Sequence, residues 1–191
     1  MVFGSFLNLQ RPQRQPSGAV WPRSFAFAGV CAATLLCGAG LAALAQAPYA
    51  LSGRPAPDFT LRAAVGANVR LGEHRGEVVV LSFWSGGCGA CRPQLLALNR
   101  SLATYASAGL VVFGIGVDDS PTRAREFAQH QRVSFPMLLD PQKSMGRAYE
   151  VDNLPMTVLI DRSGTVRYVL RDYSAASDEI YLQRLRALLN E

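Results

Sequence analysis

Two cysteines separated by a Gly-Ala pair, Cys88 and Cys91, are the part of this sequence best suited to chemistry. They follow residues 77–84, a continuous β-branched and aromatic run that is typical of a strand buried on both faces. They also open a predicted helix over residues 88–107. Two thiols at this spacing can close a disulfide. Because a helix N-terminus favours a thiolate, we expect a redox-active disulfide in which Cys88 is the catalytic nucleophile.

The apolar residues of the predicted helix indicate the role of the second cysteine. Steps of four, three, four and three residues form one apolar stripe, which consists of Cys91, Leu95, Leu98, Leu102 and Tyr105. Cys91 should therefore be buried and act as the resolving thiol.

Two other uses of the cysteine pair stay open, namely an inert disulfide and half of a zinc site. Zinc would need two more Cys or His ligands, and His74 and His130 are not at ligand spacing. We expect both histidines on exposed surfaces, and Asp118 and Asp119 in a solvated turn at a strand end. No His directly follows Cys91, so covalent haem attachment is not indicated, and no cofactor is expected.

Hydrophobic period and turn residues predict an α/β domain. Strands are expected at residues 57–61, 69–71, 77–84, 110–117, 135–139, 156–161 and 165–171. Helices are expected at residues 88–107, 121–131 and 142–149, and a last one starts at Ser177 or Asp178. This order implies a central mixed sheet with helices on both faces. The strands before the closing hairpin should be parallel, and that hairpin antiparallel.

Several motifs carry a resemblance to a known family: PAPDFTL, VVVLSFW, CGAC, GLVVFGIGVDDS, FPMLLD, AYEV and LPMTVLIDRSG. Over residues 54–190 they resemble the thioredoxin-like family that includes TlpA, ResA and the cytochrome c maturation thioredoxins. The resemblance implies a thioredoxin fold and a membrane-tethered thiol–disulfide oxidoreductase, usually a reductant of apocytochrome c or of copper-site cysteines. The partners it implies are a protein disulfide substrate and a membrane-embedded thiol reductant.

The resemblance also implies substrate-binding residues. Leu154-Pro155 aligns with the family's cis-proline, where the backbone beside the disulfide can pair with an extended substrate chain. A trans proline that opens a strand is the alternative. Trp84, which precedes the cysteine loop, either lines the substrate face or is a core aromatic.

Around the cysteines the sequence departs from the family pattern. Gly87 stands where the family often has Trp, so the approach to the first cysteine is open. Gln94 stands where the reductases commonly have Glu, and it either neighbours the thiols or points to solvent. Leu96 stands at the helix position where the family has a proline. Pro93 either kinks a helix that starts at the first cysteine or marks a helix that begins only near Arg92.

The N-terminal part of the chain differs in composition from the thioredoxin-like domain expected at residues 57–191. Residues 1–23 are polar, contain three arginines and no acid, and should form a disordered cytoplasmic N-terminus. Residues 24–46 form an uncharged stretch long enough to cross a bilayer, and the preceding arginines favour a periplasmic domain on a single-pass anchor in the bacterial inner membrane. A cleaved signal, with an A-x-A pattern at residues 43–45, is the alternative. Residues 47–56 should form a linker.

Charge and motif content limit the other functions. The formal net charge is +5, of which residues 1–53 hold +3, so the domain is nearly neutral and nucleic-acid binding is not expected. A Cu(I)-binding thiol metallochaperone is one alternative, although no Met or His lies near the pair in sequence to act as a third ligand. A peroxiredoxin-like peroxidase is another, but the eight residues that end at Cys88 lack the Pro and Thr of a P-x-x-x-T-x-x-C loop.

Overall fold

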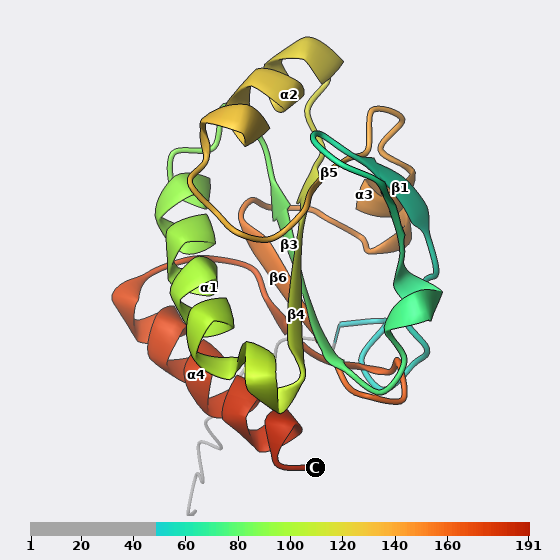
Figure 1. Ribbon diagram of the computed structural model, residues 1–191, viewed down its shortest axis with the longest axis vertical. Coiled ribbons are helices and arrows are strands. Elements are labelled where there is room, and N and C mark those ends of the chain that lie inside the picture. The colour runs from blue at the N-terminus through green and yellow to red at the C-terminus, as the bar shows by residue number, and fades with distance from the viewer. Residues whose placement is uncertain (1–48) are drawn as a thin grey trace, which may run out of the picture. The chain divides into compact units, whose positions relative to one another are not determined.

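The computed structural model describes residues 49–191, in which a seven-stranded sheet is flanked by helices (Figure 1). The strands are β1 (Thr60–Ala63), β2 (Asn68–Arg70), β3 (Val78–Trp84), β4 (Leu110–Gly116), β5 (Met137–Leu139), β6 (Met156–Ile160) and β7 (Val166–Leu170). The helices are α1 (Cys91–Tyr105), α2 (Pro121–His130), α3 (Ser144–Ala148) and α4 (Ala175–Leu189), with short 3₁₀ helices η1 (Leu71–His74) and η2 (Ala106–Ala108). Each predicted strand and helix is present, with its ends shifted by a few residues.

The strands lie in the order β2-β1-β5-β4-β3-β6-β7. As predicted, β3, β4 and β5 are parallel, and β6 and β7 form an antiparallel hairpin. The prediction of parallel strands before that hairpin is wrong for β1 and β5, which pair antiparallel. β1 and β2 form an antiparallel hairpin of their own. A tight hairpin sets the direction of β2 against β1, but no sequence pattern sets the direction of β1 against the distant β5.

The start of α4 also differs from the prediction. Ser174 is the N-cap, and its side chain accepts a hydrogen bond from the backbone N–H of Ser177 at 3.2 Å. The hydroxyl of Ser177 accepts one from the backbone N–H of Ser174 at 2.6 Å. This reciprocal capping box makes Ser177, which was expected to start the helix, the third helical residue.

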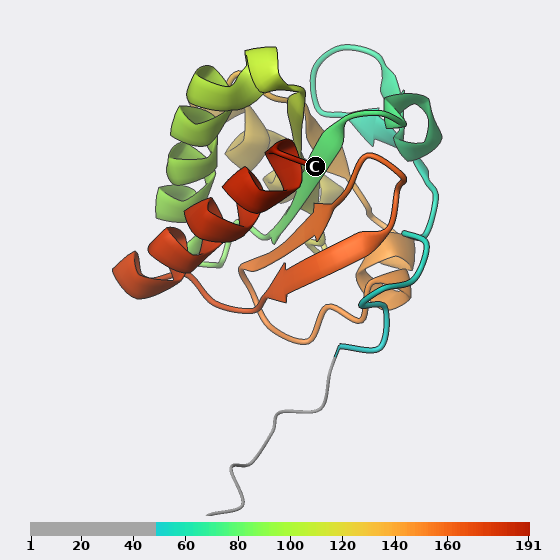
Figure 2. The ribbon, with the colours of Figure 1, turned by 90° about the horizontal axis from the view of Figure 1, so that it is seen from below.

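Alternate residues of β3 face two separate cores. Val78, Val80 and Trp84 belong to the core beneath α1, α2 and α4. The opposite side of the strand contributes to a second core, which Phe59 and Tyr149 help to fill, through Val79, Leu81 and Phe83. The ribbon views agree, since α1 and α4 cover one face of the sheet and α3 lies on the other (Figures 1 and 2). The predicted mixed sheet with helices on both faces is therefore confirmed.

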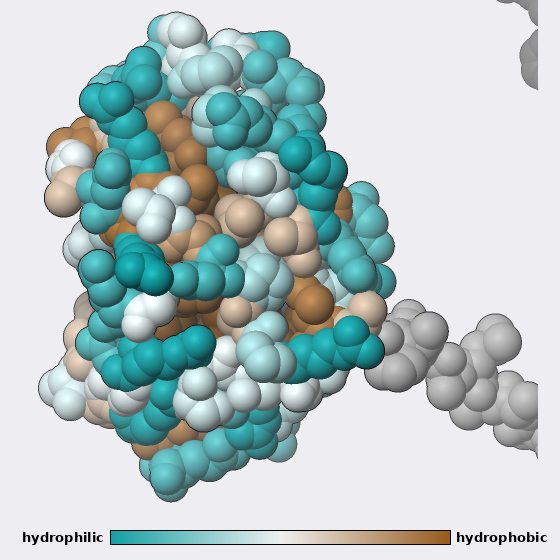
Figure 3. Space-filling view, turned by 90° about the vertical axis from the view of Figure 1, so that its right-hand side faces the viewer, coloured by the Kyte–Doolittle hydropathy of each residue, from teal (hydrophilic) through white to brown (hydrophobic). Residues whose placement is uncertain are grey.

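The described surface is mostly hydrophilic on the side that carries β1 and α3. There, apolar side chains lie in hollows between polar ones (Figure 3). Within residues 49–191, no helix is long and apolar enough to cross a membrane. The expected anchor at residues 24–46 and the expected disordered segment at residues 1–23 lie outside the described residues.

Part of the expected linker packs on the domain. The N–H of Gly53 donates to the carbonyl of Val166 at 2.8 Å, and the N–H of Val166 donates to the carbonyl of Arg54 at 2.9 Å. Pro55 forms an isolated bridge with Thr165. Residues 53–55 thus extend the sheet at the start of its edge strand β7.

Trp84 lies in the core and not on a substrate face. Its side chain is fully buried and stacks on Phe127, with 4.9 Å between the ring centroids. A Cβ at Gly116, which pairs with Trp84 across β3 and β4, would lie 2.6 Å from the indole ring. The expectation that Trp84 lines the substrate face is therefore wrong, and the alternative of a core aromatic is correct. The ring can be buried because Gly116 on the neighbouring strand has no side chain to occupy the same space.

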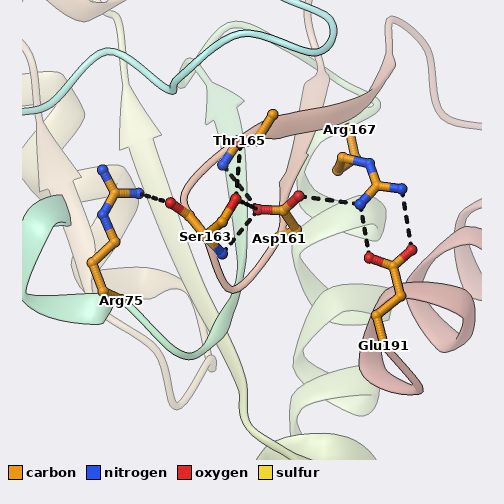
Figure 4. A network of polar contacts seen from close by, with 6 residues as sticks. All are labelled: Arg75, Asp161, Ser163, Thr165, Arg167 and Glu191. Carbon is orange, nitrogen blue, oxygen red and sulfur yellow. Dashed lines mark hydrogen bonds and ion pairs between the residues drawn. The ribbon is translucent and has the colours of Figure 1, made fainter.

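A polar network fastens the last residue to the β6–β7 hairpin (Figure 4). Arg167 donates to both carboxylate oxygens of Glu191, at 2.7 and 3.1 Å, and to Asp161 at 3.1 Å. Asp161 also accepts hydrogen bonds from Ser163 and Thr165 in the turn. Burial opposes ionisation of Asp161, but these hydrogen bonds outweigh it and hold the pKa of the carboxyl below its ordinary value. The turn and the end of α4 are thereby held together.

The close approach of Gly116 to Trp84 predicts the effect of a single methyl group. Gly116→Ala should lower the free energy of unfolding by about 1–3 kcal/mol, because the new Cβ overpacks the core. Denaturant unfolding measures this loss, and it should shrink when Trp84 is also replaced by Phe. Gly87→Ala, whose Cβ would meet no atom within 4 Å, is the matched control. Equal losses in the two alanine variants would contradict the packing account.

Candidate active site

The two cysteines lie where β3 leads into α1. Their sulfur atoms form a disulfide with an S–S distance of 2.06 Å and a Cα–Cα distance of 5.4 Å. Cys91 is fully buried and packs in the same core as Leu95 and Leu98, which confirms the predicted apolar stripe. Cys88, in the preceding loop, is partly exposed. A reagent in solvent therefore reaches the pair through Cys88.

The helix begins at Cys91, with Ala90 as N-cap, so the predicted start at Cys88 is wrong and the alternative of a helix that begins only near Arg92 is confirmed. Pro93 consequently lies in the first turn, where backbone N–H groups have no partner within the helix, so the kink expected for an interior proline does not arise. Cys88 lies one turn before the helix, where the dipole acts more weakly than we expected. The first turn of the helix holds no acidic residue and includes the exposed Arg92.

The loop that leads to Cys88 is tied to the end of β4. The backbone N–H of Gly86 donates to both carboxylate oxygens of Asp118, at 2.9 and 3.2 Å. Asp118 thus holds the loop in place, a role beyond the solvated turn residue predicted from the sequence. The neighbouring Asp119 is fully exposed and pairs with Lys143 at 2.5 Å, and this contact holds the pKa of Asp119 below its ordinary value.

An open groove of about 970 Å³ runs beside Cys88 and is lined by the segment before β6. The Leu154–Pro155 peptide bond is cis, as expected, and Leu154 lines the groove while Pro155 is buried. The N–H of Leu154 donates to the side chain of Asn153 at 2.9 Å. The structure therefore brings Cys88 and Leu154 to one groove.

Gln94 lies in a buried polar triad. Its Oε1 accepts a hydrogen bond from Ser82 of β3 at 2.9 Å, and its Nε2 donates to Thr157 of β6 at 2.5 Å. All three side chains are buried, so the alternative in which Gln94 points to solvent is wrong. The sequence analysis did not identify Ser82 and Thr157. Their hydroxyls at apolar positions of two strands were the available signal, since a buried hydroxyl requires a partner.

The two histidines, both expected on exposed surfaces, differ in their exposure to solvent. His130 is exposed, as expected, whereas His74 is half-buried and its Nδ1 lies 2.7 Å from a carboxylate oxygen of Glu77. Across residues 49–191, no group of three or more His, Cys, Asp or Glu side chains is arranged to hold a metal ion.

Comparison with known proteins agrees with this geometry. The AhpC/TSA family matches residues 52–169. The thiol-disulfide oxidoreductase ResA of Geobacillus kaustophilus is 30% identical over 135 residues, which cover 70% of this chain and 78% of that protein. ResA of Bacillus subtilis is 30% identical over 114 residues, which cover 60% of this chain and 64% of that protein. The crystal structure of a thiol:disulfide interchange protein described as DsbE, from Chlorobium tepidum, has a TM-score of 0.69 at 32% identity and covers 72% of this chain and 97% of that chain.

The family match spans more than half of the chain, and the relatives share both the fold and a named activity. A disulfide at the junction of a central strand and its following helix is the chemical group that this activity requires. The chain therefore belongs to the AhpC/TSA family, has a thioredoxin fold, and is a thiol–disulfide oxidoreductase of the ResA and DsbE type.

Proposed function

We propose that the dithiol form of this protein reduces disulfides of other proteins in the periplasm, with Cys88 as the attacking thiol and Cys91 as the resolving thiol. The Cys88 thiolate attacks one sulfur of the substrate disulfide, which expels the first substrate thiolate and leaves a mixed disulfide. The Cys91 thiolate then attacks Cys88, the bond to the substrate breaks, and the second substrate thiolate leaves. Two electrons pass to the substrate, whose two sulfurs take up protons, and Cys88 and Cys91 end as a disulfide.

The difference in burial between the two sulfurs supports this order of attack. A substrate reaches Cys88 through the open groove, whereas Cys91 lies under the loop with none of its surface exposed. The sulfur atom that Cys91 can attack is therefore that of Cys88, once Cys88 is in the mixed disulfide.

The substrate class that we propose is a cysteine pair in apocytochrome c or in a copper-site protein, with a membrane-embedded thiol reductant that returns Cys88 and Cys91 to the dithiol. The groove beside Cys88 is open along its length and offers the backbone of Leu154 as an edge for an extended chain. Because the N–H of Leu154 is bonded to Asn153, a substrate backbone would replace that bond. Capture of substrates on a Cys91→Ser variant, followed by their identification, tests the substrate class.

The periplasmic location predicts a topology. A reporter that is active only in the cytoplasm, fused after Glu191, should stay silent, because the arginines before residues 24–46 favour a cytoplasmic N-terminus and export of the domain. Replacing the three arginines Arg11, Arg14 and Arg23 by acidic residues should raise the reporter signal. A strong signal from the unaltered chain would refute the location.

The proposed roles predict unequal thiols. In reduced protein, Cys88 of a Cys91→Ser variant should alkylate at least about tenfold faster than Cys91 of a Cys88→Ser variant, because Cys88 is partly exposed whereas Cys91 is fully buried. Cys88→Ser should abolish disulfide reduction, and Cys91→Ser should accumulate mixed disulfides. Alkylation is followed by mass spectrometry at matched pH, and equal rates in the two variants would reject the roles.

The buried triad predicts the effect of a charge beneath the site. Gln94→Glu should raise the apparent pKa of Cys88 by about one unit, because a buried carboxylate one helical turn from Cys91 opposes thiolate formation at the cysteine pair. The measurement is the rate of Cys88 alkylation across pH. Gln129→Glu, on the exposed surface of α2, controls for added charge in general. Superimposable curves for wild type and Gln94→Glu would show that this position is not coupled to the thiols.

A further inference from the structure

The first residues that the structure describes, 49–57, form a strap that is fixed to the domain. The N–H of Ser52 closes a turn by donating to the carbonyl of Tyr49 at 2.9 Å. The N–H of Ala56 donates to the carbonyl of Gly164, in the turn between β6 and β7, at 2.9 Å. The strap is therefore part of the folded domain, and its side chains can hold other parts of the domain in place.

The strap is bound to Tyr149 at both of its ends. The phenol of Tyr49 donates a hydrogen bond to the backbone carbonyl of Tyr149, and the hydroxyl of Tyr149 donates one to the carbonyl of Pro57 at 2.8 Å. Tyr149 is fully buried, and its ring packs on Phe83 of β3 with 5.4 Å between the centroids. Because burial and the nearby Glu150 raise the pKa of Tyr49 to about 12, the phenol of Tyr49 keeps its proton and can donate this bond at neutral pH.

The chain then forms one wall of the groove beside Cys88. This groove wall consists of residues 150–154, all of which line the groove. The N–H of Leu154 donates to the side chain of Asn153, and the N–H groups of the two residues before Leu154 donate to no group in the described part of the chain. Glu150, at the start of the wall, has a φ of 50°, which is uncommon for a residue other than glycine and needs contacts that hold it. The groove wall therefore depends on support from the residues behind it.

Arg171 connects the groove wall to Tyr49 a second time. Its guanidinium lies over the ring of Tyr49, 5.3 Å from the centroid, and 3.4 Å from a carboxylate oxygen of Asp152. Its carbonyl accepts a hydrogen bond from the side chain of Asn153 at 3.1 Å. Because an exposed ion pair contributes little by itself, the ring beneath the guanidinium is what keeps Arg171 directed at the wall. The hydroxyl and the ring of Tyr49 thus support the same wall, one through the carbonyl before it and the other through Arg171.

We propose that Tyr49 is a positioning residue for disulfide exchange with polypeptide substrates, and that it acts by holding the groove wall in place beside Cys88. The inference rests on the proposed disulfide exchange at Cys88 and adds a residue that does not touch the substrate. Because a misplacement of about 1 Å can slow a positioned reaction by about a hundredfold, a loosened wall should slow exchange with a substrate that fills the groove. A small disulfide needs only the exposed sulfur of Cys88 and should react at an unchanged rate.

The test compares a peptide with a small disulfide in single-turnover reactions of the reduced full chain. Cys31 and Cys37 are replaced by Ala in every protein, so that only the thiols of the site react. The small probe is dithiodipyridine, and the peptide probe has about ten residues with one central cysteine as a mixed disulfide with thiopyridine. Both probes release thiopyridone, which gives the rate constant. The dependence of the rate on peptide concentration separates binding from the limiting rate constant.

The variants separate the two contacts of Tyr49. Tyr49→Phe keeps the ring and loses the hydroxyl, whereas Tyr49→Leu loses both. Tyr168→Leu is the matched control. Tyr168 is likewise half-buried and lies under an arginine, with the guanidinium of Arg184 at 5.0 Å from its ring centroid, but it does not line the groove beside Cys88.

The ratio of the peptide rate constant to the dithiodipyridine rate constant should fall by about tenfold in Tyr49→Leu and about threefold in Tyr49→Phe, and by less than about twofold in Tyr168→Leu. Hydrogen exchange in the oxidised Tyr49→Leu protein should quicken at the N–H of Val151, which donates to the carbonyl of Gly146 at 2.8 Å, and stay unchanged in β4. A purely structural role would lower the free energy of unfolding and leave the ratio as in wild type.

Two results would overturn the inference, namely a ratio that neither Tyr49 variant changes and a ratio that Tyr168→Leu lowers as much as Tyr49→Leu. Unchanged exchange at Val151 in Tyr49→Leu would also overturn it. Failure of the reduced wild type to react even with dithiodipyridine would instead refute the proposed exchange at Cys88.

Discussion

The burial of Cys91 at the first turn of α1 is the constraint on which the site depends. Its side chain is packed beneath the helix with Leu95 and Leu98, against a sheet whose central strand β3 is buried along its whole length. Because a disulfide limits how far two Cα atoms can be apart, a fixed Cys91 also fixes the place of Cys88. Cys91 lies inside the core, and the partly exposed Cys88 lines the groove. The unequal access that the reaction requires is thus a consequence of core packing.

Polar contacts position the site without placing a buried charge beneath it. Gln94 joins Ser82 and Thr157, so it links α1 to two neighbouring strands of the sheet through neutral groups. The charged residues lie around the rim, where Asp118 holds the loop at Gly86 and Asp119 pairs with Lys143. The polar groups beneath the helix are therefore neutral, and the charged groups that contact the cysteine loop lie at the surface.

Much of this arrangement could be read from the sequence, because the signals were local. The continuous apolar run gave β3, and the steps of three and four residues gave the buried face of α1. The start of α1 was missed by three residues because Pro93 fits either a kinked helix or a first turn, and only the loop geometry decides between them. Trp84 could not be placed because its pocket depends on Gly116, a residue on another strand. The partners of Gln94 were missed for the same reason, since Ser82 and Thr157 meet it only through the sheet register.

The most direct test of the account is the site at which a substrate becomes attached while both cysteines are present. Reduced protein is mixed with a disulfide-containing substrate, quenched with acid within the first turnover, digested and examined by mass spectrometry for the cysteine that carries the substrate. The account predicts attachment at Cys88, with the Cys88–Cys91 disulfide as the later product. Attachment at Cys91, or at both cysteines equally, would contradict it.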